Sequence, residues 1–212
     1  MQSIQTNQIF SLSKAKPLDG ILRYREFCLS ATKRTLAGGF NQRRRSPVTG
    51  ELLEEWGEVD GLPYLCCQKS GSLFLGTLPS DESWSVLLDE VSRYRQTSNA
   101  FHQDIKTSRA ENVFQPKLDW IQNVLRVQNV TKPFLMEVVT PPSDFSPLLK
   151  QSNVFKEILT VEEMSLVRGE ILEKKYFQAA VLLESLDRVS DPQKLLEGVH
   201  RSLEKGGLLF VT

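Results

Sequence analysis

The chain has 212 residues, of which 40% are hydrophobic, and its 26 lysines and arginines are balanced by 26 aspartates and glutamates. This balance creates no long-range field that would attract nucleic acid or an anionic membrane, so we expect neither as a partner. No apolar run reaches the roughly 18 residues that span a bilayer, and residues 1–16 lack the apolar core of a secretory signal. The odd number of cysteines, three, argues against a disulfide framework. We therefore expect a folded cytoplasmic protein.

The first 132 residues divide into three segments of different character. Residues 1–40 contain one helix-forming stretch, 18–37, and we interpret them as a helical lead-in. Residues 41–80 alternate short apolar runs with turns rich in glycine and proline, which predicts a small module of β-hairpins. Residues 81–132 are expected to form a helical connector, because Ser80 and Asp81 offer an N-cap for one helix and Pro116 marks the start of another.

Residues 133–212 alternate apolar runs with helical patterns, which is typical of βαβ units and a mostly parallel sheet. Strands are predicted at 134–139, 155–161, 177–183 and 208–211. The helix before the last strand is the most clearly marked element, with Asp191 as its N-cap, Pro192 as its first residue and Gly206-Gly207 as its stop signal. The fold class expected from these patterns is α/β.

Two segments of the expected sheet resemble class I (Rossmann-like) S-adenosylmethionine-dependent methyltransferases. Residues 134–146 read FLMEVVTPPSDFS and are similar to the family's first strand and E-x-G-x-G-x-G loop, with Glu137 at the acidic position. Residues 177–210 resemble the family's F-D-x-x-x-x-x-x-x-L-E-H-V-x-D-P segment and its closing L-x-P-G-G-x-L strand. The resemblance implies a Rossmann-like methyltransferase sheet. That sheet is expected to be incomplete, because only 14 residues separate Glu162 from Phe177 and leave no room for one β-α unit.

The resemblance also implies a site for S-adenosylmethionine. Its expected residues are Glu137, Val139, Pro141, Ser143, Glu162 and Gln178. Glu162 ends the second predicted strand, where the family places a carboxylate that accepts hydrogen bonds from the ribose hydroxyls, although Glu162 and Glu163 could equally be solvated loop carboxylates. Val139, Pro141 and Ser143 replace all three loop glycines, and they stiffen and crowd the backbone that would face the cofactor. We expect cofactor binding to be weak or lost, and we assign no catalytic residue.

Residues 41–80 resemble the zinc-ribbon module that precedes the methyltransferase domain in some bacterial relatives. That module is built from two C-x-x-C-G knuckles, whereas this chain reads SPVTG at 46–50 and CQKSG at 67–71. The turn glycines, Gly50 and Gly71, are kept, but Cys67 alone remains of the four ligands that a structural zinc needs. We expect a degenerate ribbon that holds no zinc.

Two functions follow from the resemblance and stay open at this point. The first is a methyltransferase that acts on a small-molecule or sugar-like acceptor, and the second is a catalytically inactive methyltransferase-like protein that binds a partner. A dinucleotide-dependent dehydrogenase is least favoured, because no G-x-G-x-x-G follows any predicted strand.

The final strand, 208–211, raises a separate expectation. In the family the corresponding strand is interior to the sheet, and here its LLFV run has no lysine, proline or bulge to protect an edge. We expect the chain to self-associate, or to bind a partner, through this edge. The alternative is that Lys205 and the terminal carboxylate add enough charge to protect so short a strand.

Overall fold

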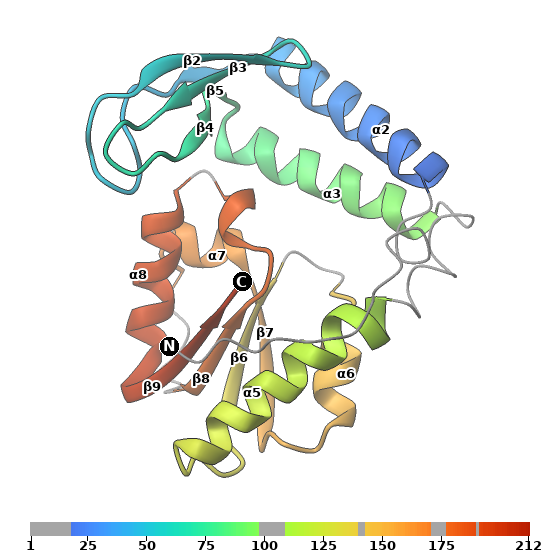
Figure 1. Cartoon of the computed structure of the whole chain (residues 1–212), viewed down its shortest axis with the longest axis vertical. Coiled ribbons are helices and arrows are strands. Elements are labelled where there is room, and N and C mark those ends of the chain that lie inside the picture. Colours follow the sequence, from blue (N-terminus) through green and yellow to red (C-terminus); the bar gives the residue numbers. More distant parts are fainter. Residues whose placement is uncertain (1–17, 98–108, 140–142, 171–176, 190) are drawn as a thin grey trace.

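The computed structural model describes residues 18–97, 109–139, 143–170, 177–189 and 191–212 (Figure 1). A parallel sheet with helices on both faces forms one part of it. Two long helices and a small antiparallel β module form the other part, which lies over one end of the sheet. The α/β fold with a parallel sheet that the sequence predicts is confirmed.

Four parallel strands form the sheet in the order β7-β6-β8-β9. They are β6 (Phe134–Val139), β7 (Glu157–Glu162), β8 (Phe177–Leu182) and β9 (Leu203–Val211). Strand β6 has the bounds that the sequence predicts, and β7 begins at Glu157 rather than at Phe155. The prediction that all four strands join one sheet is confirmed.

Gly206-Gly207 do not end the preceding helix, contrary to the prediction. Helix α8 (Pro192–Ser202) ends earlier, and Leu203 already pairs with Phe177 of β8. The two glycines lie within β9, where the register with β8 is irregular. Gly206 has a φ of 84°, and a Cβ on Gly207 would lie 3.2 Å from the carbonyl oxygen of Phe177. Glycine is therefore needed for a kink in the strand and not for a helix cap.

Helices cover both faces of the sheet (Figure 1). Helices α5 (Gln115–Val127) and α6 (Ser146–Gln151) pack on one face, and α7 (Glu163–Val167) and α8 pack on the other. Because successive strand residues point to opposite faces, Leu135 of β6 packs with the α5 side and Met136 with the α8 side. The predicted N-cap of α8 is confirmed, since the Asp191 carboxylate accepts the Lys194 N–H at 3.0 Å.

The other part of the molecule consists of helices α2 (Leu18–Ala37) and α3 (Asp81–Thr97) with the β module between them in sequence. The module's strands are β1 (Asn41–Gln42), β2 (Glu54–Val59), β3 (Leu62–Cys66), β4 (Leu73–Leu75) and β5 (Thr77–Leu78), all paired antiparallel. This confirms the hairpins predicted for 41–80. Neither α2 nor any other helix in the described ranges is long and apolar enough to cross a membrane.

Helix α3 connects the two parts. The rings of Phe27 in α2 and Tyr94 in α3 stack with their centroids 3.9 Å apart, which pairs the two helices. The indole Nε1 of Trp84 donates to the carbonyl oxygen of Arg188, and the Trp84 ring packs against the core on the α8 side of the sheet. Helix α3 consequently lies over the carboxyl ends of the strands (Figure 1).

We expect Gly198→Ala to destabilise the protein, because α8 approaches α7 closely at this residue. A Cβ on Gly198 would lie 3.1 Å from Leu166 Cβ and 3.2 Å from the Leu166 carbonyl oxygen. Overpacking of about 1–3 kcal/mol should exceed the gain of about 1 kcal/mol that alanine has over glycine inside a helix. Urea denaturation should show a net loss, while Glu197→Ala on the exposed side of α8 should change stability by less than about 0.5 kcal/mol. A more stable Gly198→Ala protein would contradict the packing argument.

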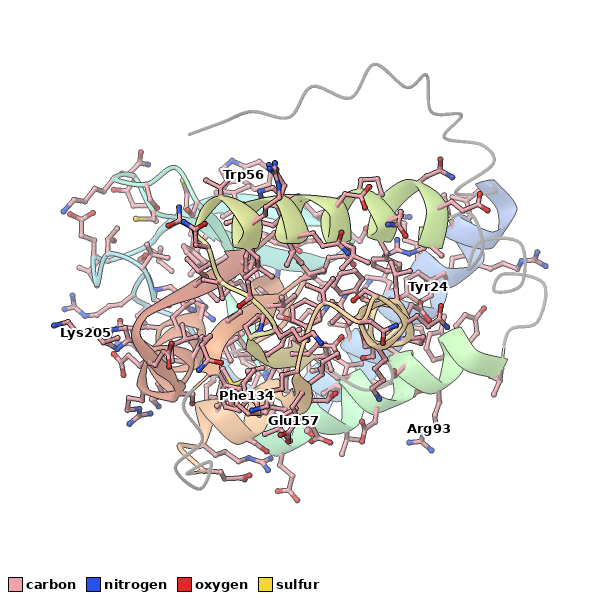
Figure 2. The ribbon with its side chains drawn as sticks, turned by 90° about the horizontal axis from the view of Figure 1, so that it is seen from below. Tyr24, Trp56, Arg93, Phe134, Glu157 and Lys205 are labelled. Atoms are coloured by element: carbon pink, nitrogen blue, oxygen red, sulfur yellow. The ribbon has the colours of Figure 1, made fainter. Side chains whose placement is uncertain are left out.

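We also predict self-association through β9, which lies at the edge of the sheet. No strand in the described part of the chain pairs with its outer side, and Leu209 and Val211 are 39% and 37% exposed. Lys205, which also belongs to β9, lies at the periphery of the molecule (Figure 2). Light scattering should show association that grows with protein concentration and that Leu209→Lys relieves, because a charged side chain opposes edge pairing. Val127→Lys, on an exposed site of α5, is the control; a clean wild-type monomer at high concentration would reject the prediction.

Candidate functional site

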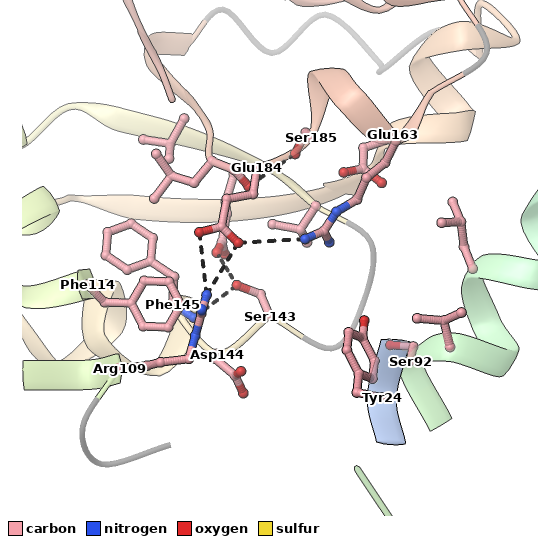
Figure 3. A pocket seen from close by; sticks show the side chains of 17 residues that line it. Tyr24, Ser92, Arg109, Phe114, Ser143, Asp144, Phe145, Glu163, Glu184 and Ser185 are labelled. Atoms are coloured by element: carbon pink, nitrogen blue, oxygen red, sulfur yellow. Dashed lines mark hydrogen bonds and ion pairs between the residues drawn. The ribbon is translucent and has the colours of Figure 1, made fainter. Parts of the chain in front are cut away.

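The strand order opens a crevice at the carboxyl end of the sheet. Strand β7 lies on one side of β6 and β8 on the other, and open α/β sheets bind ligands at such a point. A cavity of about 230 Å³ lies here, and α2 and α3 contribute to its wall (Figure 3). The Ser185 hydroxyl, in the segment after β8, donates to the carbonyl oxygen of Val138 in β6 at 3.2 Å. This bond links β8 to β6 at the crevice. The charged lining residues are Arg109, Glu137, Asp144, Glu163, Glu184 and Arg188.

Glu137 fastens the segment that follows β6 to the sheet. Its carboxylate is fully buried and accepts hydrogen bonds from the hydroxyls of Ser143 at 2.9 Å, Ser146 at 2.5 Å and Thr160 at 3.4 Å. The Ser143 hydroxyl in turn accepts the N–H groups of Phe145 and Ser146, both at 3.1 Å. A buried carboxylate needs such donors to replace water. The Glu137 carboxylate is therefore engaged in holding the wall of the cavity together.

The structure brings together only part of the cofactor site expected from the sequence. Glu137, Val139 and Ser143 line the cavity, whereas Glu162 is exposed at the end of β7 and is not among its lining residues. Pro141 lies outside the described residues. Gln178 lies at the amino end of β8, whereas the cavity lies at the carboxyl end of the sheet.

Gln178 has a structural role where it lies. Its side-chain oxygen accepts the Phe134 N–H at 2.7 Å, and its side-chain nitrogen donates to Glu204 at 2.9 Å. These bonds tie β8 to the start of β6 and to β9. Although the family motif assigns Gln178 to the cofactor site, the residue does not line the cavity.

Two carboxylates of the cavity escaped sequence reasoning. Glu163 is 2% exposed and lines the cavity, because β7 ends at Glu162 and the chain turns into α7 at the next residue. The sequence signal for it was the adjacent pair Glu162 and Glu163, of which the resemblance assigns Glu162 to the cofactor. Glu184 falls at a variable position of the family segment, so no motif marks it.

Glu184, just after β8, forms ion pairs with three cations, of which Figure 3 labels Arg109. Its carboxylate lies 3.3 Å from Arg109 Nη2, 3.4 Å from Lys117 Nζ and 3.6 Å from Arg188 Nη2. Burial acts to raise the pKa of Glu184, but the attraction of Arg109, Lys117 and Arg188 outweighs it and holds the pKa below its usual range. Its φ of 58° is uncommon for a residue with a side chain, and such backbone conformations cluster at functional sites.

The residue types that line the cavity indicate which parts of a ligand it can contact. Neither a cysteine nor a histidine occurs among the described residues that line the cavity. Glu137 is engaged by hydroxyls and Glu184 by cations, so each already has a structural task. Arginine, carboxylate and aromatic groups remain to recognise the polar and apolar parts of a small ligand.

The β module keeps the four knuckle positions close to one another. The Thr49 hydroxyl lies 3.2 Å from Cys67 Sγ, and the hydroxyls of Ser70 and Ser46 also form hydrogen bonds with Cys67. Hydrogen bonds from Ser70 and Thr49 lower the pKa of the Cys67 thiol to about 6, although burial acts to raise it. Three hydroxyls and one thiol thus gather at the positions where the zinc ribbon has four cysteines.

The two turn glycines have the same role in both knuckles. Gly50 and Gly71 have φ values of 73° and 68°, and their N–H groups donate to the carbonyl oxygens of Ser46 at 2.9 Å and Cys67 at 2.8 Å. Glycine adopts this left-handed conformation without strain, which explains why glycine occupies both turns. No group of three or more His, Cys, Asp and Glu residues that could hold a metal occurs in the described ranges.

We predict that cysteines at the three altered knuckle positions would create a zinc site. The variant Ser46→Cys/Thr49→Cys/Ser70→Cys should hold one zinc per chain after desalting, because its four sulfurs would surround one point as a tetrahedral site requires. Elemental analysis measures this directly, and the wild-type chain should hold none. A control that carries Ser72→Cys in place of Ser70→Cys should bind zinc poorly. Tightly held zinc in the wild-type chain, or none in the triple variant, would contradict this description of the module.

Comparison with protein-family models, with curated proteins and with solved structures finds no match. The resemblance to methyltransferases therefore stays a hypothesis from the residues.

Proposed function

We propose that this protein is a class I methyltransferase-like protein that binds a small ligand at the carboxyl end of its sheet and does not transfer methyl groups. The proposal combines the sequence resemblance with the place of the cavity. Residues 134–146 and 177–210, which carry the resemblance, include β6, β8 and β9, and the cavity lies where β6 and β8 end.

The strand order supports kinship with this fold class. In doubly wound sheets the second strand lies on one side of the first, and the chain then crosses over to add later strands on the other side. The order β7-β6-β8-β9 has this arrangement, with helices on both faces. It is also the arrangement expected if one β-α unit is missing between Glu162 and Phe177.

The positions of the Glu162 and Glu137 carboxylates argue against S-adenosylmethionine as the ligand. Glu162, which the resemblance assigns to the ribose, is exposed and does not line the cavity, while Glu137 is engaged by three hydroxyls. The cavity of about 230 Å³ is smaller than the ~300–1,000 Å³ typical of sites for drug-sized ligands. Val139 adds a β-branched side chain to the wall where the family has glycine. These residues do not fit the cofactor in the pose that the family motif implies.

One observation favours a second candidate, an active methyltransferase. Glu163 is buried, lines the cavity and follows directly on β7, so it could take the ribose-binding part assigned to Glu162. In that case the acidic position of the family motif corresponds to Glu163, one residue later in the chain than Glu162. The two glutamates form a matched pair that distinguishes the candidates.

Calorimetric titration of the full chain with S-adenosylmethionine tests the proposed function. We expect no binding, or a dissociation constant far weaker than micromolar, for the wild-type chain and for Glu162→Gln and Glu163→Gln alike. Micromolar binding to the wild-type chain would contradict the proposal. If that binding were weakened about 10-fold or more by Glu163→Gln and not by Glu162→Gln, the active enzyme would be favoured, since the loss of a charged acceptor has about this effect.

A further inference from the structure

The cation cluster around Glu184 is larger than one carboxylate requires. Arg109, Lys117 and Arg188 all lie within 3.6 Å of it, so three positive charges face one negative charge. The Arg109 guanidinium donates to both Glu184 oxygens through one nitrogen, Nη2, at 3.3 and 3.4 Å. The separations of 3.3 to 3.6 Å exceed the 2.7–2.9 Å usual for charge-assisted hydrogen bonds. Arg109 therefore does not bind Glu184 through the two parallel N–H groups that arginine offers a carboxylate.

The cluster is held by separate elements around the cavity. Arg109 directly precedes η1 (Ala110–Phe114), and its guanidinium lies 5.0 Å from the centroid of the Phe114 ring. Arg188 ends η2 (Leu186–Arg188), and its carbonyl oxygen accepts from Trp84. Lys117 in α5 also donates to the Thr212 hydroxyl at 3.2 Å. Cations fixed in this way are preorganised for an anion, because few rotamers are lost when it binds.

The remaining charges of the cavity decide which anion fits. Asp144 and Glu163 also line it, and Glu137 lies in its wall. These carboxylates repel a multiply charged phosphate more strongly than a singly charged anion. The rings of Phe114 and Phe145, whose centroids are 5.6 Å apart, offer apolar surface to the rest of the ligand.

We propose that the cavity binds a small organic carboxylate, which Arg109 and Arg188 hold beside Glu184. Lys117 does not line the cavity and acts through Glu184, whose carboxylate it helps to position. The acidic residues on the other walls favour a ligand that also carries an amino group. This inference names the chemistry of the ligand in the proposed function, and it rests on that proposal.

Titration of the full chain with acetate, L-leucine and inorganic phosphate tests the inference. Both carboxylates should bind, L-leucine more tightly because of its amino group and apolar side chain, and phosphate should bind least. Arg188→Gln should weaken L-leucine binding about 10-fold through loss of a charged donor. Arg201→Gln, on the surface of α8 and outside the cavity, should leave binding unchanged. Glu184→Gln should tighten it about 10-fold, because the internal carboxylate no longer competes for the cations.

Each result supports or overturns the inference. No binding of either carboxylate, tighter binding of phosphate, or equal affinity in Arg188→Gln and the wild-type chain would overturn it. If Glu184→Gln fails to fold, the comparison of Arg188→Gln with Arg201→Gln decides alone. Micromolar binding of S-adenosylmethionine would contradict the proposed function, whether or not acetate and L-leucine bind. Absence of carboxylate binding together with absence of cofactor binding would remove only this inference.

Discussion

The parallel pairing of β6 with β8 is the contact on which the rest of the structure depends. The chain leaves β6 for β7 on one side and later returns to β8 on the other, so the segments after β6 and β8 separate at the carboxyl end of the sheet. The Ser185 hydroxyl bridges this point to the Val138 carbonyl oxygen. This separation leaves room for the cavity, whose walls are formed by residues that follow the strands together with residues of α2, α3 and η1.

Hydroxyl groups hold together the two segments that carry the resemblance to the family motifs. After β6, the hydroxyls of Ser143 and Ser146 bind Glu137 and fix a segment that lacks the family's glycines. In the β module, Thr49 and two serines surround Cys67 where the zinc ribbon has metal and three further cysteines. A hydroxyl both donates and accepts, so it can satisfy a buried polar atom without a metal or a cofactor. Hydroxyl groups therefore satisfy the buried polar atoms of both segments.

The electrostatics of the cavity arise from parts of the chain that lie far apart in sequence. Arg109, Lys117 and Arg188 meet at Glu184, and helix α3, anchored by Trp84, lies above them. The attraction between these cations and the Glu184 carboxylate holds the pKa of Glu184 low and orders the wall of the cavity. The surplus of positive charge at this point, among carboxylates on the other walls, is the feature that a ligand would recognise.

The sequence by itself determined the α/β class, the single parallel sheet, the hairpins of 41–80 and the N-cap of α8, because these follow from apolar periodicity and from local hydrogen bonding near Asp191. Sequence reasoning failed at Gly206-Gly207, where pairing of Leu203 with Phe177 overrides the local helix stop signal. Only the tertiary structure decided that Glu163 and not Glu162 lines the cavity, and that Glu184 gathers three cations. Such contacts join residues up to 75 positions apart, as between Arg109 and Glu184, and no local pattern records which distant charges will meet.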